Sequence, residues 1–187
     1  MSRFISYLIT DPKYYSSNPI KLKKKILTAS SRKKVDFVCY RDKSSKNFKQ
    51  LAVNFLKISK KIKFSKILLN SDIDLAYRLK FDGVHLPSSK LYEIKRAKKK
   101  RLFVIASTHN FYELNLAIKN GADMVVFSPV FYTPNKQEPK GLNTLRKAVF
   151  HSKIPVIALG GIVNRYQIHK VKIKKASGFS SIRYFIK

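Results

Sequence analysis

Short apolar blocks of four to six residues alternate along the chain with longer segments in which apolar and polar residues mix. Blocks this short, rich in Val, Ile and Leu and bounded by turn residues, predict buried strands. The predicted strands are Phe4–Ile9, Val35–Tyr40, Ile67–Asn70, Gly83–Leu86, Leu102–Ala106, Met124–Phe127, Pro155–Leu159 and Gly178–Ile182.

The longer segments predict helices at Pro19–Ser30, Asn47–Lys61, Asp72–Leu79, Tyr92–Lys99, Phe111–Asn120, Asn143–Phe150 and Asn164–Lys170. In the second of these, Leu51, Phe55 and Ile58 recur at helical spacing, which is typical of one buried face. Asp72 stands where it would cap the third helix.

Eight buried strands alternating with helices, without an antiparallel hairpin signal, predict a parallel sheet. Eight is the number of strands that closes a barrel, so we expect residues 1–187 to form one compact (β/α)8 TIM barrel. An open doubly wound sheet is the alternative. With 187 residues the barrel would be shorter than the ~200 residues usual for this fold, and its last helix would be curtailed.

The segment 121–141 combines a strand with a long polar loop. Asn120-Gly121 is a helix-stop signal, Met124–Phe127 is the sixth predicted strand, and three prolines follow before Gly141 restarts a helix. Loops of this length in compact domains are usually functional, and a solvated connection is the alternative.

Polar residues follow the predicted strands at the points where the strands end. In a TIM barrel these positions share one face, which carries the chemistry. They are Arg41 and Lys43, Asn70 to Asp72, Ser107 to Asn110, Ser128 to Lys140, Gly160-Gly161 and Ser180-Ser181.

Two of these strand ends suggest a phosphate site. Gly160-Gly161 would let backbone N–H groups approach an anion closely, and Gly178–Ser181 supplies a second such turn, although a Gly-Gly pair is often only a tight turn. Arg41, Lys43 and Lys136 are cations on the same rim, suited to a second, more highly charged phosphate group. The residues alone therefore predict a barrel that binds phosphorylated small molecules.

The composition of the chain argues against several other classes of protein. A hydrophobic content of 44% excludes wholesale disorder, and a single cysteine excludes an internal disulfide. There is no apolar run of ~18 residues and no signal-peptide core at Met1-Ser-Arg-Phe4, so we expect a cytoplasmic protein. Four dispersed histidines give no metal-ligand spacing.

The net charge of +30 admits three interpretations: a nucleic-acid face, attraction of anionic substrates, or a lysine-rich solvated surface. The positive blocks fall on helices and helix ends, interleaved with apolar positions, and no recognition motif accompanies them. This favours the solvated surface over nucleic-acid binding. No pattern predicts an oligomeric state or a membrane partner.

Several segments together resemble a known family. They are Tyr40–Lys43, Leu69–Leu75, Gly83–Leu86, Ser107–His109, Gly121–Asp123, Ser128–Lys136, Lys140–Leu142 and Ile154–Ile162. The chain resembles thiamine-phosphate synthase and its thiazole tautomerase (TenI-type) relatives over nearly its whole length.

This resemblance implies a TIM barrel that handles a thiazole phosphate and, in the synthase, a pyrimidine diphosphate. It implies a diphosphate site of Arg41, Lys43, Asn70, Ser107 and Lys136, with Arg41, Lys43, Ser107 and Lys136 as the catalytic candidates. It implies substrate contacts from His85, Thr108, Thr133, Gly160, Gly161, Gly178, Ser180 and Ser181, although His85 equally fits a core histidine.

The chain departs from the synthase pattern at two places where carboxylates would hold Mg²⁺. The family's Asn-Asp reads Asn70-Ser71 here, and its His-x-Gly-Gln-x-Asp ends in Lys90. Asp72, one residue along, is the remaining candidate metal ligand. We hypothesise that Lys90 replaces the charge of the metal.

The tautomerase pattern also fits only in part. Leu86-Pro87-Ser88-Ser89 is closer to that branch, but its catalytic histidine would stand where this chain has Pro129. Three functions remain open: a thiamine-phosphate synthase, a thiazole phosphate tautomerase, and a non-catalytic binder of thiazole or thiamine phosphate.

Overall fold

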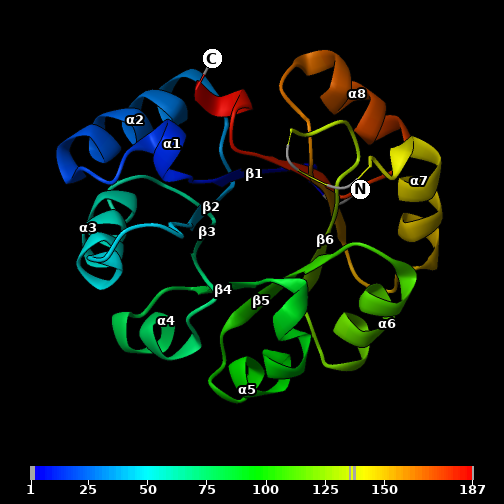
Figure 1. The fold of residues 1–187 in the computed structure, drawn as a ribbon, viewed down its shortest axis with the longest axis horizontal. Helices are drawn as coiled ribbons and strands as arrows, with labels where there is room; N and C mark the ends of the chain where they lie inside the picture. The colour runs from blue at the N-terminus through cyan, green and yellow to red at the C-terminus, as the bar shows by residue number, and fades with distance from the viewer. Residues whose placement is uncertain (1–2, 135, 137, 187) are drawn as a thin grey trace.

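The computed structural model describes residues 3–134, 136 and 138–186. It is a closed barrel of eight parallel strands in the order β1 to β8, with β8 paired to β1, which confirms the predicted TIM barrel (Figure 1). The strands are β1 (Ile5–Ile9), β2 (Phe37–Tyr40), β3 (Lys66–Asn70), β4 (Gly83–Leu86), β5 (Phe103–Thr108), β6 (Met124–Phe127), β7 (Val156–Ala158) and β8 (Gly178–Ser181).

The helices form a ring around the strands (Figure 1). They are α1 (Pro12–Tyr15), α2 (Pro19–Arg32), α3 (Phe48–Ser59), α4 (Ile73–Leu79), α5 (Ile94–Lys99), α6 (Phe111–Lys119), α7 (Gly141–His151) and α8 (Arg165–Ile173), with the 3-10 turns η1 (Ser88–Glu93) and η2 (Tyr184–Ile186). The curtailed last helix is confirmed, because only η2 follows β8 among the described residues. Several details differ from the prediction. α1 fills the first connection, the segment expected as one helix from Tyr92 is divided between η1 and α5, and β5 continues through Ser107 and Thr108, two residues beyond its predicted end.

The strands bury side chains on both faces, as continuous apolar blocks require. One cluster fills the barrel interior, and a larger one lies between the barrel and the helices. Successive side chains alternate between these layers. The interior members are Tyr7, Ile9, Phe37, Cys39, Leu68, Ile105, Val126 and Ile157.

Besides the short α1, four helices of the described chain begin at a side-chain cap, which fixes where the preceding loop ends. Asn18, Asp72, Asn110 and Asn164 each accept a hydrogen bond from a backbone N–H in the first turn of α2, α4, α6 and α8. The predicted cap at Asp72 is confirmed, with Oδ1 at 2.9 Å from the Leu75 nitrogen.

Three carboxylates close the opposite, amino-terminal end of the barrel. Asp36, Asp82 and Asp123 each stand just before a strand and accept a backbone N–H of the neighbouring strand. Asp123 also forms an ion pair with Lys98. These hydrogen bonds stabilise the amino-terminal end of the barrel. In TIM barrels generally, active sites lie at the opposite end, where the carboxyl ends of the strands meet.

No helix in the described part of the chain is both long and apolar enough to cross a bilayer.

Candidate functional site

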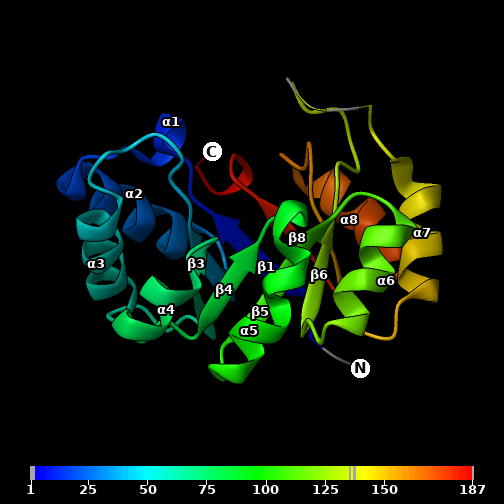
Figure 2. The same ribbon diagram turned by 60° about the horizontal axis from the view of Figure 1, so that its bottom comes forward.

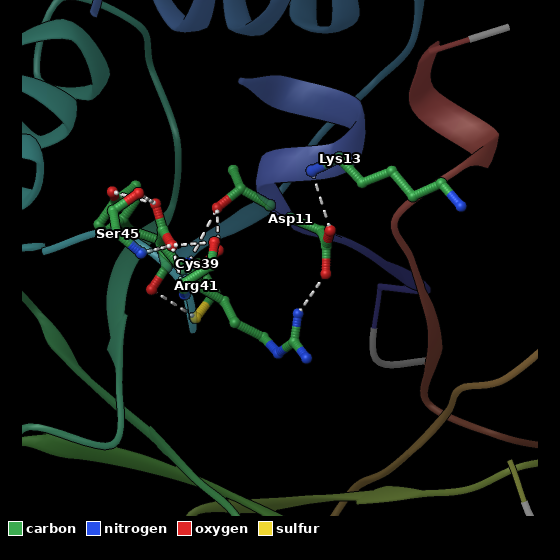
Figure 3. Close-up of polar contacts among 9 residues, drawn as sticks. Asp11, Lys13, Cys39, Arg41 and Ser45 are labelled. Carbon is green, nitrogen blue, oxygen red and sulfur yellow. Dashed lines mark hydrogen bonds and ion pairs between the residues drawn. The ribbon is translucent and has the colours of Figure 1, made fainter. Parts of the chain in front are cut away.

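The carboxyl ends of the strands form the mouth of the barrel, and Arg41 enters it from the end of β2. The Thr10 hydroxyl, just after β1, donates to the Arg41 carbonyl and accepts from the Arg41 nitrogen, which locks the two strand ends together. The guanidinium donates to Asp11 at 2.6 Å (Figure 3). Asp11 caps α1 through the Lys13 nitrogen, so this carboxylate is itself held.

Lys43 and Lys136 share this side of the mouth with Arg41, as the sequence predicted. Arg41, then burial, then Lys136 lower the pKa of Lys43, while Asp11 raises it. A like charge lowers a lysine pKa only when it lies close enough to be felt through the protein and solvent. Three cations from the ends of β2 and β6 therefore act on one region. Positions 135 and 137 of the loop lie outside the described residues.

A cavity of about 630 Å³ opens beside these cations, between the ends of β2, β3 and β4. It contains three cationic side chains and four carboxylates, with Asn70 and Ser71 between them. Its lining residues are Asp42, Lys43, Phe48, Asn70, Ser71, Asp72, Ile73, Asp74, Lys90, Glu93 and Arg96.

Two of the four carboxylates accept hydrogen bonds from neighbouring loops or from the helix that follows them. Asp42 accepts from the hydroxyls of Ser17 and Ser45. Burial would raise the pKa of Asp42, but these hydrogen bonds and those from the backbone outweigh it and hold the pKa below its usual value. Asp72 is the N-cap of α4, and its Oδ1 accepts a hydrogen bond from the Leu75 nitrogen.

The other two carboxylates are paired with cations. Asp74 forms ion pairs with Arg96 and Lys100, and Glu93 forms ion pairs with Arg96 and Lys90. Mg²⁺ in proteins is bound through one or two carboxylates together with waters and substrate phosphates. Within the described residues, no three His, Cys, Asp or Glu side chains are grouped so that they could hold a metal ion. Each of the four carboxylates already has a hydrogen-bond or ion-pair partner, and Lys90 places a positive charge among them. The set is therefore a poor fit for the Mg²⁺ that the sequence resemblance implies, and Asp72 caps α4.

His85 connects the interior of the barrel to the mouth. Its Nδ1 lies 2.9 Å from the Tyr7 hydroxyl and its Nε2 lies 2.8 Å from Ser107 Oγ. The Tyr7 and His85 rings stack with their centroids 5.7 Å apart. Burial, with a smaller effect of Arg41, lowers the pKa of His85 to about 4. At neutral pH the ring is therefore uncharged, with one nitrogen donating and the other accepting, and it orients the Ser107 hydroxyl.

The opposite side of the mouth is made of backbone. Gly160 and Gly161 follow β7 with φ values of 100° and 67°, a region that L side chains rarely adopt. A Cβ at Gly161 would lie 2.4 Å from the Tyr132 oxygen, and one at Gly160 would lie 2.6 Å from the Pro129 Cα. The Phe131 nitrogen donates to the Gly160 carbonyl.

The loop after β6 therefore rests on the two glycines at its base and projects beyond the barrel at the end opposite the N-terminus (Figure 2). Thr133, the predicted thiazole contact, lies in this loop and donates to the Phe131 carbonyl at 3.1 Å. Asn70 and Ser107 continue the inward-facing rows of Leu68 and Ile105 at the ends of β3 and β5. The structure thus brings Asn70 and Ser107 to the mouth.

Three other residues predicted for the site do not face the mouth with a free polar group. Thr108 follows Ser107 in the strand and so faces outward, where its hydroxyl donates to the Val126 carbonyl. Gly178 lies at the amino end of β8, away from the mouth, where a Cβ would lie 2.3 Å from the Ile5 oxygen. The Ser181 hydroxyl is occupied by the Ile162 carbonyl and the Tyr184 nitrogen. We therefore leave these three residues out of the candidate site.

Ser180 behaves differently from its neighbour. It lies beside Tyr7 on the inward face of β8, it is fully buried, and its hydroxyl has no hydrogen-bond partner among the described residues. A buried hydroxyl without a partner is costly unless a ligand or water completes it. Ser180 therefore stays in the candidate site.

Two contributors were missed from the sequence. Asp11 obeys the rule used for the other strands, because it comes just after β1. Tyr7 lies in an apolar block. Side chains alternate between the two faces of a strand, and this alternation places Tyr7 inside the barrel, where its hydroxyl needs a polar partner.

Comparisons with known proteins agree with this geometry. The family described as thiamine monophosphate synthase matches residues 6–185. A relative from Aquifex aeolicus is 34% identical over 186 residues, which cover 96% of this chain and 96% of the relative. A thiamine-phosphate synthase from Hydrogenobaculum sp. is 30% identical over 97% of this chain and 87% of its own length. The solved structure of a thiamine phosphate pyrophosphorylase from Pyrococcus furiosus superimposes with a TM-score of 0.82 at 25% identity, covering 96% of this chain and 85% of the other.

Proposed function

The chain belongs to the thiamine monophosphate synthase family, as its motifs predicted, and on this basis we propose that it is a transferase of thiamine biosynthesis. In this proposal it joins a pyrimidine diphosphate to a thiazole phosphate and releases pyrophosphate. The carbon–oxygen bond of the diphosphate ester breaks, and its electron pair leaves with the pyrophosphate. The lone pair of the thiazole nitrogen then forms the new carbon–nitrogen bond, so atoms and charges balance.

The diphosphate would occupy the cationic side of the mouth. Arg41, Lys43 and Lys136 supply positive charge where the leaving group gains negative charge, which is the main demand of such a step. Asn70 and Ser107 supply donors from the inward faces of β3 and β5. His85 fixes the direction of the Ser107 hydroxyl.

The thiazole phosphate would occupy the backbone side. Gly160 and Gly161 turn the chain after β7 in positive-φ conformations, and we expect backbone N–H groups of this turn to meet the phosphate. The Ser180 hydroxyl, which has no hydrogen-bond partner among the described residues, faces the same interior. Thr133 is held over this side by the loop after β6 and is the proposed contact to the thiazole.

The observation that carries the proposal is the gathering of cations at Lys43. Arg41 and, less strongly, Lys136 lower the pKa of Lys43, and an anionic ligand bound there would relieve this repulsion. A tautomerase or a simple binder handles one phosphate and needs fewer cations. A diphosphate substrate would engage Lys43 and Lys136, and also Arg41, whose charge Asp11 balances only in part.

The proposal is tested by rescue of a thiamine auxotroph that lacks its synthase, together with release of pyrophosphate by the purified chain supplied with both substrates. We expect growth and pyrophosphate release in the presence of both substrates. Binding of thiazole phosphate alone, without growth, would overturn the proposal in favour of a binder. Interconversion of thiazole phosphate isomers would overturn it in favour of a tautomerase.

A further inference from the structure

Lys90 occupies the cavity beside the proposed diphosphate site. It lies in η1, just beyond β4, and its Nζ is 3.3 Å from the Ser71 carbonyl and 3.6 Å from Glu93 Oε1. Its backbone nitrogen donates to the Pro87 carbonyl at 2.9 Å, which anchors the residue to the end of the strand. The side chain therefore spans the gap between the ends of β4 and β3.

The Lys90 ammonium keeps capacity for an anion. An ammonium has three donors, and its two contacts in the structure are long for hydrogen bonds. Lys43 lines the same cavity from the end of β2, so two cations face this space from different strands. Asn70, whose amide donates to Ser71 Oγ, lies between them.

The same space is unfavourable for a divalent cation. Each of its four carboxylates already has a partner: Asp42 accepts loop hydroxyls, Asp72 Oδ1 caps α4, and Asp74 and Glu93 are in ion pairs. A fixed ammonium in the cavity would also repel a metal ion directly. The charges that would receive a metal elsewhere are here already balanced by the chain's own cations.

We propose that Lys90 and Lys43 form a metal-independent diphosphate site, in which the Lys90 ammonium supplies the positive charge that a divalent ion would otherwise supply. This inference rests on the proposed function for its substrate, but it concerns binding and does not require turnover. The diphosphate bridges the two ammonium groups across the ends of β2 and β4.

The test is calorimetric titration of the full chain with inorganic pyrophosphate, in EDTA and in Mg²⁺, with the free pyrophosphate corrected for its magnesium complex. We expect dissociation constants that agree within about threefold in the two conditions. Lys90→Ala should weaken binding on the order of 10- to 100-fold, because it removes a charge-assisted contact. Lys95→Ala removes the same charge from the exposed face of neighbouring α5 and should leave binding unchanged.

A reciprocal variant sharpens the test. Ser71→Asp combined with Lys90→Asp adds two carboxylates to the cavity and should make pyrophosphate binding depend on Mg²⁺. Three results would overturn the inference: binding by the unmodified chain only with Mg²⁺, no pyrophosphate binding in either condition, or equal binding by Lys90→Ala and Lys95→Ala. Metal-independent binding without rescue of the auxotroph would defeat the proposed function and leave this inference standing.

Discussion

The two sides of the barrel mouth present different chemical groups: charged side chains on one side and main chain on the other. The side at β2–β4 presents long charged side chains: Lys43 and Lys90 line an open cavity, and Arg41 pairs with Asp11 at the end of β2. The side at β7 presents Gly160 and Gly161, whose missing Cβ atoms are filled by backbone of the loop after β6. One side depends on charge, and the other depends on close approach of main chain.

This difference predicts different responses to change. Several cations act together at the first side, so removing one weakens binding by a limited factor and leaves the fold intact. The second side has no alternative geometry, because an added methyl group meets backbone atoms that cannot move independently. Substitutions there should affect stability and binding together.

The largest effect is expected for Gly161→Ala. The left-handed conformation of an alanine costs roughly 1–2 kcal/mol, and overlap with the Tyr132 oxygen adds about 1–3 kcal/mol. We expect a total loss of about 2–5 kcal/mol in the free energy of unfolding, measured by denaturant titration, together with loss of thiazole phosphate binding.

Gly141→Ala is the matched control for this prediction. Gly141 also has a positive φ, of 77°, but no atom of the described residues lies within 4 Å of the position that a Cβ would take. It should therefore lose only the conformational part, roughly 1–2 kcal/mol. Equal losses in the two variants would show that steric contact contributes nothing at Gly161, and the contrast between the two sides would fail.

The next largest effect is the pH dependence of stability that His85 causes. This histidine is buried in the barrel interior, below both sides of the mouth. The pKa of His85 is about 4 in the folded chain, below the ordinary value of 6.5, because burial disfavours the charged ring. Its contribution to stability is therefore present above pH 6.5 and is lost as the pH falls through 4. By pH 4 the loss should reach about 3 kcal/mol.

Denaturant titrations between pH 7 and pH 4 measure this loss, and NMR of the His85 ring measures its pKa directly. His85→Gln should flatten the pH dependence in this window. An NMR pKa near 6.5 in the folded chain would contradict the buried neutral ring, and with it the orientation of Ser107.

The fold was predictable because each strand is a short apolar block, and eight such blocks leave few arrangements of a parallel sheet. The boundaries of β4 and β6 agree with the sequence prediction residue for residue. Parts of the site were less predictable because adjacent residues in a strand face opposite ways. Ser107 and Thr108 belong to one motif, yet only Ser107 faces the interior.

Other parts depend on contacts between residues that are distant in sequence. Asp11 meets Arg41, and Tyr7 meets His85, only after β1 has paired into the closed barrel. Gly178 was misplaced for a related reason: a glycine near a strand end suggests a ligand turn, whereas here it admits the backbone of β1. Sequence patterns identify which strand end is polar, but they do not identify which partner receives each polar group.

A smaller effect is expected for Lys43→Gln on the charged side. Pyrophosphate binding should weaken about 10- to 100-fold and thiazole phosphate binding by less than about threefold, because the other cations and the glycine side remain. Calorimetry at low and high salt should show a weaker salt dependence in the variant. Lys46→Gln removes the same charge from an exposed position nearby, and a matching loss there would assign the effect to the net charge of +30.

The smallest effect is expected for Asp72→Asn, which separates a helix cap from a metal ligand. Asn caps a helix about as well as Asp, so stability should change by less than about 0.5 kcal/mol, whereas Asp72→Ala should lose about 1 kcal/mol. Pyrophosphate binding in the presence of Mg²⁺ should be the same for Asp72→Asn and the unmodified chain. A carboxylate that held Mg²⁺ would behave in the opposite way, since an amide keeps the hydrogen bond to the Leu75 nitrogen but removes the charge that attracts the ion. If Asp72→Asn lowered Mg²⁺-dependent binding without lowering stability, Asp72 would be a metal ligand at the end of β3. The charged side of the mouth would then bind Mg²⁺, as the sequence resemblance implies.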